Sequence, residues 1–280
     1  MPELPEVETI RQQLEPRVVG ATIADAGAHW SDKFSPALDA VGTEIVSARR
    51  RGKYLLFDLD PGADGGPPRE LVVHLGMTGR LAVHEPGSAL ALDDPATEPH
   101  LRAWWRFTDG RTFTFHDTRR FGRIKVVDAG DYRTLPTLDH LGPEPWDPAF
   151  TGRVLAAFVK RSNRHLKTIL LTQRAVAGVG NIYADEALWM AKINPATRRL
   201  SVNRADRLVE TIRTALQSGL DHGGTTLRDY VDSDGSTGAN QHELHCYGRS
   251  GSPCHRCATE LRSRVLDART TTYCPTCQAR

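Results

Sequence analysis

The sequence lacks any apolar run long enough to cross a membrane. No stretch reaches the roughly 18 consecutive apolar residues that a membrane-spanning helix needs. The first ten residues carry Glu3, Glu6 and Glu8, whereas a secretory signal needs positive charge there. These absences argue against a membrane protein and a secreted one, so we expect a cytosolic protein.

Cysteine is also scarce, with five in 280 residues, too few for the disulfide framework of a small secreted domain. Four of them form two pairs, Cys254-x-x-Cys257 and Cys274-x-x-Cys277, with sixteen residues between the pairs. That spacing predicts a structural zinc site on two knuckles, because four thiolate ligands leave no coordination position open for catalysis. Cys246 lies outside the spacing and is expected to be a small buried residue.

A large net charge is absent, since the formal value is only +2. Of the 36 basic residues only six are lysine. An arginine excess suits phosphate recognition, but it also follows from GC-rich coding. Placement is more informative: residues 153–174 carry six basic and no acidic side chains, and residues 246–280 carry six arginines against two acids. These two stretches indicate contact with a nucleic-acid backbone.

The first half of the chain has the pattern of an antiparallel β domain. After a short helix expected over residues 5–14, strands are expected between residues 20 and 133, most clearly at 53–59, 71–75 and 111–116. In the last of these, Phe113 and Phe115 share one face. Residues 61–69 and 85–99 are rich in proline, glycine or charge and are expected to be loops. A sandwich or barrel follows from this pattern.

The second half is expected to be helical. Four prolines in residues 134–152 predict a linker. A long helix follows in which apolar residues recur every four positions from Leu208 to Leu220, and Asn203, three residues before Asp206, is expected to begin it. The predicted boundaries are therefore 1–133, 134–152, 153–238 and a terminal zinc module at 239–280.

The start of the chain, Met1-Pro-Glu-Leu-Pro-Glu-Val-Glu-Thr9, has two interpretations. Removal of Met1 turns Pro2 into a secondary amine that titrates near pH ~8 and forms an iminium with a sugar carbon. Alternatively, Pro2 and Pro5 merely begin a helix.

This opening resembles that of formamidopyrimidine-DNA glycosylases, the bacterial oxidised-purine glycosylases, and further segments resemble motifs of this family in the family's order. These segments are Arg51-Gly-Lys-Tyr-Leu-Leu56, His74-Leu-Gly-Met-Thr-Gly79, Asp117-Thr-Arg-Arg-Phe-Gly122, His140-Leu-Gly-Pro-Glu-Pro145, Gly178-Val-Gly-Asn-Ile-Tyr-Ala-Asp-Glu186, Gly223-Gly-Thr-Thr226 and Tyr247-Gly-Arg249. The resemblance covers essentially all 280 residues. It implies a multidomain α+β protein: an N-terminal antiparallel β-sandwich, a helix-two-turns-helix domain and a zinc ribbon, with DNA held between the halves.

The resemblance also implies a bifunctional glycosylase and abasic-site lyase. Pro2 would attack C1′ of the damaged nucleoside, Glu3 would act as acid and base, and Lys53 would assist; without the resemblance, Lys53 is interpreted as a solvated strand residue. The strand would then break by β- and δ-elimination, with Arg269 implicated in the later step.

The same resemblance implies a set of DNA contacts. Met77, Arg119 and Phe121 match side chains that fill the space left by the flipped base, although Met77 and Phe121 are equally compatible with core packing. His74 belongs to the same implied set of DNA-binding residues, and the positions that match or lie close to phosphate contacts are His100, Arg161, Lys167 and Asn181.

The implied partner is double-stranded DNA with oxidised bases or abasic sites. We expect a monomer with no membrane partner, one structural zinc ion per chain held by the four paired cysteines, no organic cofactor, and a bacterial cytoplasm with the nucleoid as its working location.

Two positions depart from the family pattern. Asn240 stands where members usually carry an aromatic, in a loop that covers the flipped base, and Thr118 replaces the usual proline. Both departures bear on lesion preference. The alternatives are an endonuclease VIII-like enzyme for oxidised pyrimidines, against which Leu4 and the Met77, Arg119 and Phe121 set argue, and a non-catalytic damaged-DNA-binding protein, which would be expected to lack Pro2, Glu3 or Lys53.

Overall fold

The computed structural model describes residues 1–60, 65–88, 92, 98–227 and 230–279. The chain divides into two compact units: unit 1 contains Met1–Asp139 and Gly223–Gly238, and unit 2 contains His140–His222 and Ala239–Arg280. The boundary after Asp139 falls inside the predicted linker. None of the described helices is long and apolar enough to span a bilayer.

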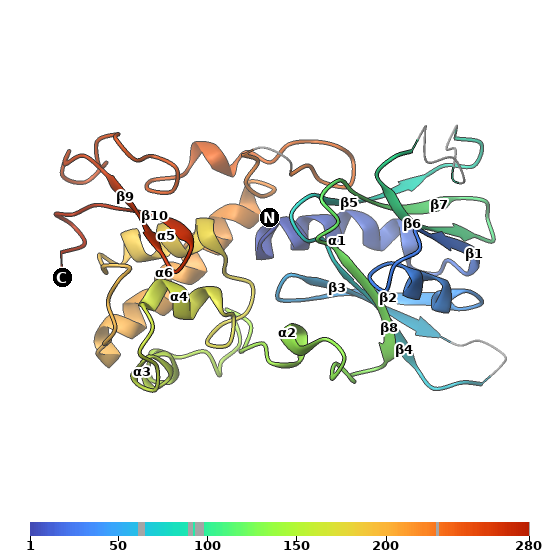
Figure 1. Ribbon diagram of the computed structural model, residues 1–280, viewed down its shortest axis with the longest axis horizontal. Helices are drawn as coiled ribbons and strands as arrows, with labels where there is room; N and C mark the ends of the chain where they lie inside the picture. The colour runs from blue at the N-terminus through green and yellow to red at the C-terminus, as the bar shows by residue number, and fades with distance from the viewer. Residues whose placement is uncertain (61–64, 89–91, 93–97, 228–229, 280) are drawn as a thin grey trace. The chain divides into compact units, whose positions relative to one another are not determined.

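Unit 1 is a β-sandwich in which, among the described residues, two four-stranded antiparallel sheets occur (Figure 1). One sheet has the order β1-β6-β7-β5 and the other β2-β3-β4-β8. The strands are β1 (Ile23–Ala28), β2 (Glu44–Arg51), β3 (Tyr54–Asp60), β4 (Arg69–His74), β5 (Gly79–His84), β6 (Leu101–Phe107), β7 (Thr112–Asp117) and β8 (Arg123–Asp128). The helices are α1 (Leu4–Val18), the 3-10 helix η1 (Ser35–Ala40) and α2 (Pro136–Asp139).

The core of unit 1 lies between the two sheets. Phe113 and Phe115 of β7 are fully buried, as their alternation predicts. The ring of Phe113 meets that of Phe57, on the other sheet, at 5.6 Å between centroids. The predicted strands at 53–59, 71–75 and 111–116 correspond to β3, β4 and β7 and are confirmed. Of the expected loops, residues 61–64, 89–91 and 93–97 lie outside the described residues.

Residues 223–238 belong to unit 1, whereas the sequence predicts them as part of the helical segment. The physical reason is a tertiary hydrogen bond: the Thr225 N–H donates to the buried Glu6 carboxylate at 2.7 Å. Gln13, further along α1, accepts from both the N–H and the hydroxyl of Ser233, at 3.0 and 2.8 Å.

The described residues of unit 2 form helices and one two-stranded hairpin. The elements are α3 (Gly152–Lys160), α4 (Leu166–Leu171), α5 (Asn181–Met190), α6 (Val202–Asp221), the 3-10 helix η3 (Asn240–His242), β9 (Arg262–Leu266) and β10 (Arg269–Tyr273). The predicted long helix is α6, but Asn203 does not begin it. Ser201 is the N-cap, because its hydroxyl accepts the Arg204 N–H at 3.4 Å, which places Asn203 inside the first turn.

Two buried carboxylates of α5 attach the C-terminal segment to the helices. Glu186 accepts the N–H groups of residues 245, 246 and 247 at 2.9, 2.8 and 2.7 Å. Asp185 accepts the Thr272 N–H at 2.9 Å and pairs with the Lys167 ammonium at 2.7 Å. Burial raises the pKa of Asp185, and the adjacent Lys167 opposes that rise. The Asp185–Lys167 pair therefore joins α4, α5 and β10.

Lys167→Met should destabilise the protein by roughly 3–5 kcal/mol at pH 8, because it leaves the Asp185 carboxylate buried without its cation. Urea denaturation would measure this loss. The matched control Lys160→Met removes an exposed lysine of α3 and should change stability by less than about 0.5 kcal/mol. The double variant Lys167→Met/Asp185→Leu should recover most of the loss. Equal stabilities for the two lysine variants would contradict the ion pair's structural role.

Candidate functional site

The first turn of α1 is buried and tightly bonded. Pro2 is buried, and Glu3 and Glu6 are only 2% and 1% exposed. Glu3 is the N-cap, and its N–H donates to the Glu6 carboxylate at 2.7 Å in a capping box. The second Glu6 oxygen accepts the Thr225 N–H. One carboxylate thus fixes both the start of the chain and residues 223–238.

The close approach of residues 223–238 to Glu6 requires glycine at position 224. Gly224 has φ +91°, and a Cβ there would lie 2.9 Å from Cγ of Glu6. The nearby Tyr230 hydroxyl is buried and donates to the Gly223 carbonyl at 3.2 Å. Glu6 was not among the site residues expected from the sequence. Its position three residues after Glu3 is the capping-box signal that could have identified it.

Lys53 occupies the two-residue turn between β2 and β3 and is 3% exposed. The interpretation of Lys53 as a solvated strand residue is therefore wrong. Gly52 before it has φ +58°, which tight hairpin turns favour. Arg50 holds the turn against α1, because its guanidinium donates to Glu8 at 3.0 Å and to the Gly52 carbonyl at 3.0 Å. The sequence contains the turn glycine, but the burial of Lys53 comes from tertiary packing that no local pattern shows.

His74 ends β4 opposite Tyr54, and the two rings lie 4.6 Å apart. Burial, with the positive charges of Lys53 and Arg123 nearby, lowers the pKa of His74 to about 4. Its Nδ1 accepts the Gly76 N–H at 3.2 Å. The imidazole is thus neutral at physiological pH and is able to offer a phosphate a hydrogen bond but no charge.

Met77, Arg119 and Phe121 lie on two loops that Asp117 joins. The Asp117 carboxylate is fully buried and accepts the Thr78 hydroxyl, the Arg119 N–H at 3.2 Å and the Gly122 N–H at 2.7 Å. Because these donors come from residues 78 and 119–122, the two loops form one body. The buried role of Asp117 is visible only in the structure.

The side chains on these loops are presented to solvent. Phe121 is 52% exposed, which excludes the core-packing interpretation for this residue, and the Arg119 guanidinium lies 4.9 Å from its ring centroid. Met77 is half-buried. Gly76 allows the loops to approach, since a Cβ there would lie 2.5 Å from the backbone nitrogen of Gly122. An exposed aromatic and cation on a rigid base are suited to entering a base stack.

In unit 2, two of the predicted residues donate to the Thr270 carbonyl. It accepts from the Lys167 ammonium at 2.9 Å and from the Asn181 amide at 3.3 Å, and Arg269 precedes it in the chain. Lys167 is 1% exposed, so its ammonium faces the protein interior and not solvent. A direct phosphate contact by Lys167 does not agree with this placement. Arg269 is exposed.

The two-residue turn that precedes Arg269 is bonded to the start of α4. Asp267 and Ala268 have φ +46° and +63°, the left-handed conformation that a two-residue hairpin turn requires. Asp267 accepts the Thr168 hydroxyl and lies 3.4 Å from Nδ1 of His165, so the hairpin tip is attached to the start of α4. Arg269 therefore projects from a fixed turn.

The remaining predicted residues are three exposed side chains and one buried amide. His100 is exposed beside β6, and its carbonyl accepts the Asp117 N–H at 2.8 Å. Arg161 is the exposed C-cap of α3. Thr118 is exposed. Asn240 is 2% exposed, and its Oδ1 accepts the Ser218 hydroxyl of α6 at 2.9 Å, so the residue that replaces the usual aromatic is a satisfied buried amide.

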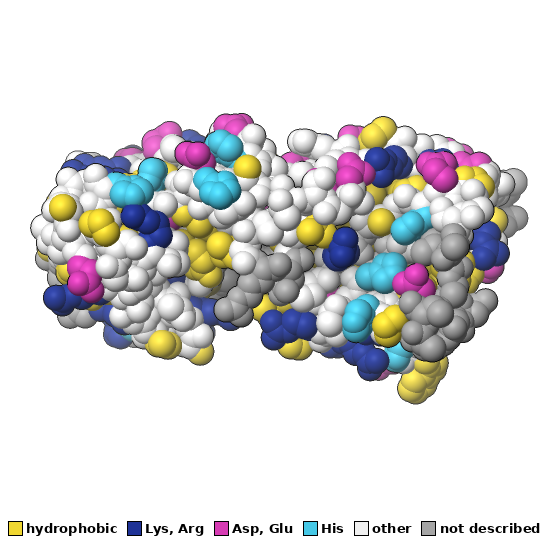
Figure 2. Space-filling model, turned by 90° about the horizontal axis from the view of Figure 1, so that it is seen from above, with side chains coloured by type: hydrophobic (Ala, Val, Ile, Leu, Met, Phe, Trp, Pro, Cys, Tyr) yellow, Lys and Arg dark blue, Asp and Glu magenta, His cyan; other side chains and the backbone are white. Residues whose placement is uncertain are grey.

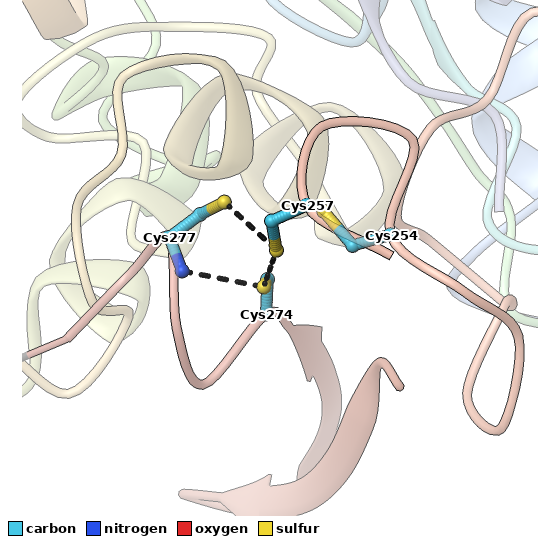
Figure 3. A group of neighbouring side chains, drawn as sticks. All are labelled: Cys254, Cys257, Cys274 and Cys277. Atoms are coloured by element: carbon cyan, nitrogen blue, oxygen red, sulfur yellow. Dashed lines mark hydrogen bonds between the residues drawn. The ribbon is translucent and has the colours of Figure 1, made fainter. Parts of the chain in front are cut away.

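The four paired cysteines form one cluster (Figure 3). Their sulfur atoms all lie within 4.8 Å of one another, with Cys257 at 3.6 Å from Cys274 and 3.4 Å from Cys277. Four thiolates around one metal ion at about 2.3 Å need sulfur separations of this size, so the residues fit a tetrahedral metal. Cys246 lies outside the cluster, is fully buried and donates to the Thr272 carbonyl at 3.2 Å.

Comparison with known proteins identifies three matching family models. These describe the formamidopyrimidine-DNA glycosylase N-terminal domain over residues 1–124, the H2TH domain of the same glycosylase over 141–231, and a zinc finger found in FPG and IleRS over 251–280. Over 285 residues the chain is 41% identical to the formamidopyrimidine-DNA glycosylase of Deinococcus radiodurans, covering 99% of this chain and 97% of the relative. It is 44% identical to that of Thermus thermophilus over 282 residues, covering 99% and 98%.

Solved structures of FPG proteins are also similar to this chain. The crystal structure of the MutM (FPG) protein of Thermus thermophilus superposes with a TM-score of 0.87 at 42% identity, covering 100% of this chain and 99% of that one. The complex of a Lactococcus lactis FPG variant with a DNA containing Fapy-dG gives 0.86 at 33% identity, covering 100% of both chains.

The lowered pKa of His74 predicts a pH-dependent stability. Between the unfolded pKa of about 6.5 and the folded pKa of about 4, the unfolded chain binds a proton at this residue and the folded chain does not. The neutral His74 therefore costs no stability above pH 6.5. As pH falls from 6.5 towards 4, the free energy of unfolding decreases by roughly 3 kcal/mol in total.

Chemical denaturation of the wild type and of His74→Asn at pH 7.5 and pH 4.5 would measure this effect, since asparagine keeps an acceptor for the Gly76 N–H but does not titrate. We expect the wild type to lose more stability on acidification than the variant. Identical pH profiles would show that His74 is protonated in the folded state.

Proposed function

Because the chain belongs to the formamidopyrimidine-DNA glycosylase family, we propose that it is a bifunctional glycosylase and abasic-site lyase of base excision repair that removes oxidised purines from double-stranded DNA. The observation that carries the proposal is the buried first turn of α1, in which Glu3 and Glu6 hold the backbone next to Pro2. Neighbours solved with Fapy-dG, abasic-site and carbocyclic 8-oxo-G DNA support the choice of substrate.

In the proposed reaction Pro2, after removal of Met1, attacks C1′ with its nitrogen lone pair. The glycosidic bond breaks, its electrons leave with the base, and the Glu3 carboxyl moves the protons that base departure and sugar-ring opening need. The product is an iminium between Pro2 and C1′. Loss of a C2′ proton then expels the 3′ phosphate, and a second elimination expels the 5′ phosphate. Water releases the sugar remnant and restores the amine.

The other residues of the site bind and orient the DNA. Lys53 lies beside His74 and adds positive charge near the reacting sugar. Arg119, Phe121 and Met77 fill the space that the extruded base leaves, which costs a few kcal/mol to open. Asn181 and Arg269 grip the backbone from unit 2, and Arg269 takes part in the later elimination. Lys167 acts through the Thr270 carbonyl, which also accepts the Asn181 amide and follows Arg269 in the chain.

Glu3→Gln should reduce excision of 8-oxoguanine or formamidopyrimidine far more than cleavage of a preformed abasic site, because only excision needs proton transfer for base departure. Single-turnover assays on duplexes carrying each lesion would measure the ratio. Glu15→Gln, an exposed residue of the same helix, is the matched control and should resemble the wild type.

A duplex with thymine glycol completes this test of lesion class. Faster removal of thymine glycol than of both purine lesions would assign the protein to oxidised pyrimidines. Equal losses on the base lesion and the abasic site would remove Glu3 from the step proposed for it.

We propose zinc as the metal of the cysteine cluster, at one ion per chain. Cys254→Ser should lose both metal and DNA affinity, because so short a module has too little core to fold without the ion. Cys246→Ser keeps a donor for the Thr272 carbonyl and should lose neither. Elemental analysis of protein purified without chelator would measure zinc content. Protein free of zinc, or equal behaviour of the two variants, would contradict this assignment.

A further inference from the structure

Unit 2 contains a cavity of about 450 Å³ that takes no part in the proposed reaction. Its polar lining consists of three arginines, Arg161, Arg164 and Arg174, together with the hydroxyls of Ser162 and Thr172. Of the arginines, only Arg161 is a DNA contact expected from the sequence. Arg164 and Arg174 carry no role in the proposed reaction.

Local hydrogen bonds fix the backbone that carries these arginines. The Arg164 N–H donates to the Ser162 hydroxyl at 3.2 Å, and the Arg174 N–H donates to the Thr172 hydroxyl at 3.4 Å. Thr172 in turn donates to the Ile169 carbonyl at 2.7 Å. The segment that follows α3 and the segment that follows α4 thus hold their arginines around one space, and the fold brings together cations that lie up to 13 positions apart.

No acidic residue that lines the cavity balances the positive charge of its arginines. None of the lining residues is acidic, and within the described part of the chain none of the three guanidinium groups forms a hydrogen bond or an ion pair. Asp267 exerts a Coulombic effect on Arg164, but its carboxylate is bonded to Thr168 and His165. By contrast, Arg49 and Arg213 bind carboxylates directly. Three like charges around one space repel one another, and an anion placed there would remove that repulsion.

This local excess contrasts with the small net charge of the whole chain. On the face drawn in Figure 2, acidic and basic side chains are interspersed, in agreement with the formal net charge of only +2. A general positive field therefore does not explain an acid-free pocket with three arginines. The guanidinium fork matches the oxygens of a phosphate group, and several forks on one anion suit phosphate better than a single carboxylate.

We propose that this cavity, the arginine pocket, binds a phosphate group. This inference rests on the proposed function, because the first source of that phosphate is the DNA backbone outside the lesion. Arg164 and Arg174 would then extend the contact proposed for Arg161. A free polyphosphate offers the same chemistry.

The test compares Arg164→Ala/Arg174→Ala with Arg153→Ala/Arg207→Ala. The control removes the same charge from two exposed arginines of unit 2 that do not line the cavity. In the first arm, affinity for an undamaged duplex is measured against salt concentration. We expect the slope of the pocket variant to fall by about 0.9, the value for one phosphate contact, and to fall more than that of the control.

In the second arm, calorimetry measures binding of inorganic pyrophosphate. The pocket variant should lose at least tenfold in affinity and the control little. Loss in both arms supports a site for the DNA backbone, and loss with pyrophosphate alone supports a site for free polyphosphate. Unchanged behaviour in both arms, or equal losses in the control, overturns the proposal.

Two further measurements keep these results unambiguous. Thermal unfolding of each variant shows that the fold is intact, and Arg164→Lys/Arg174→Lys, which keeps the charge but not the fork, should bind pyrophosphate with intermediate affinity. If this variant is as weak as the alanine pair in an intact fold, fork geometry is essential and the phosphate assignment is strengthened. Neither arm needs catalysis. Failure to excise a damaged base would therefore contradict the proposed function but not the proposed phosphate binding by the arginine pocket.

Discussion

The buried carboxylate of Glu6 is the interaction on which the backbone around Pro2 depends. A buried carboxylate is costly unless its oxygens are bonded, and both Glu6 oxygens accept backbone N–H groups at 2.7 Å, from Glu3 and from Thr225. These bonds connect parts of the chain 219 positions apart. The direction in which the chain enters α1 from Pro2, and the attachment of Thr225 to α1, depend on this one group.

Buried carboxylates also lie behind two exposed groups of the proposed site. Asp117 accepts N–H groups from the loop that carries Arg119 and Phe121, and Asp185 accepts the Thr272 N–H in the strand that begins with Arg269. In each case a bonded carboxylate inside the protein fixes a backbone from which a cation or an aromatic projects. The exposed groups are thereby oriented before DNA arrives, which lowers the entropy that binding has to overcome.

The sequence predicts what local pattern determines. Alternation predicts the strand with Phe113 and Phe115, and cysteine spacing predicts the cluster, because both are short-range consequences of geometry. It does not predict that Lys53 and Lys167 are buried, since burial depends on tertiary packing and, for Lys167, on its partner Asp185. The same limit explains why residues 223–238 lie in unit 1 and why Ser201, not Asn203, caps α6: each outcome depends on competing partners that only the folded chain selects.

The proposed reaction requires that Pro2, at the start of the chain held by Glu6, is the reacting nucleophile. The most direct measurement is borohydride reduction of the protein during incubation with an abasic duplex, followed by mass spectrometry of the cross-linked peptide. We expect a chain without Met1 and an adduct on the nitrogen of Pro2. An adduct on Lys53, or full activity in a chain that retains Met1, would contradict it.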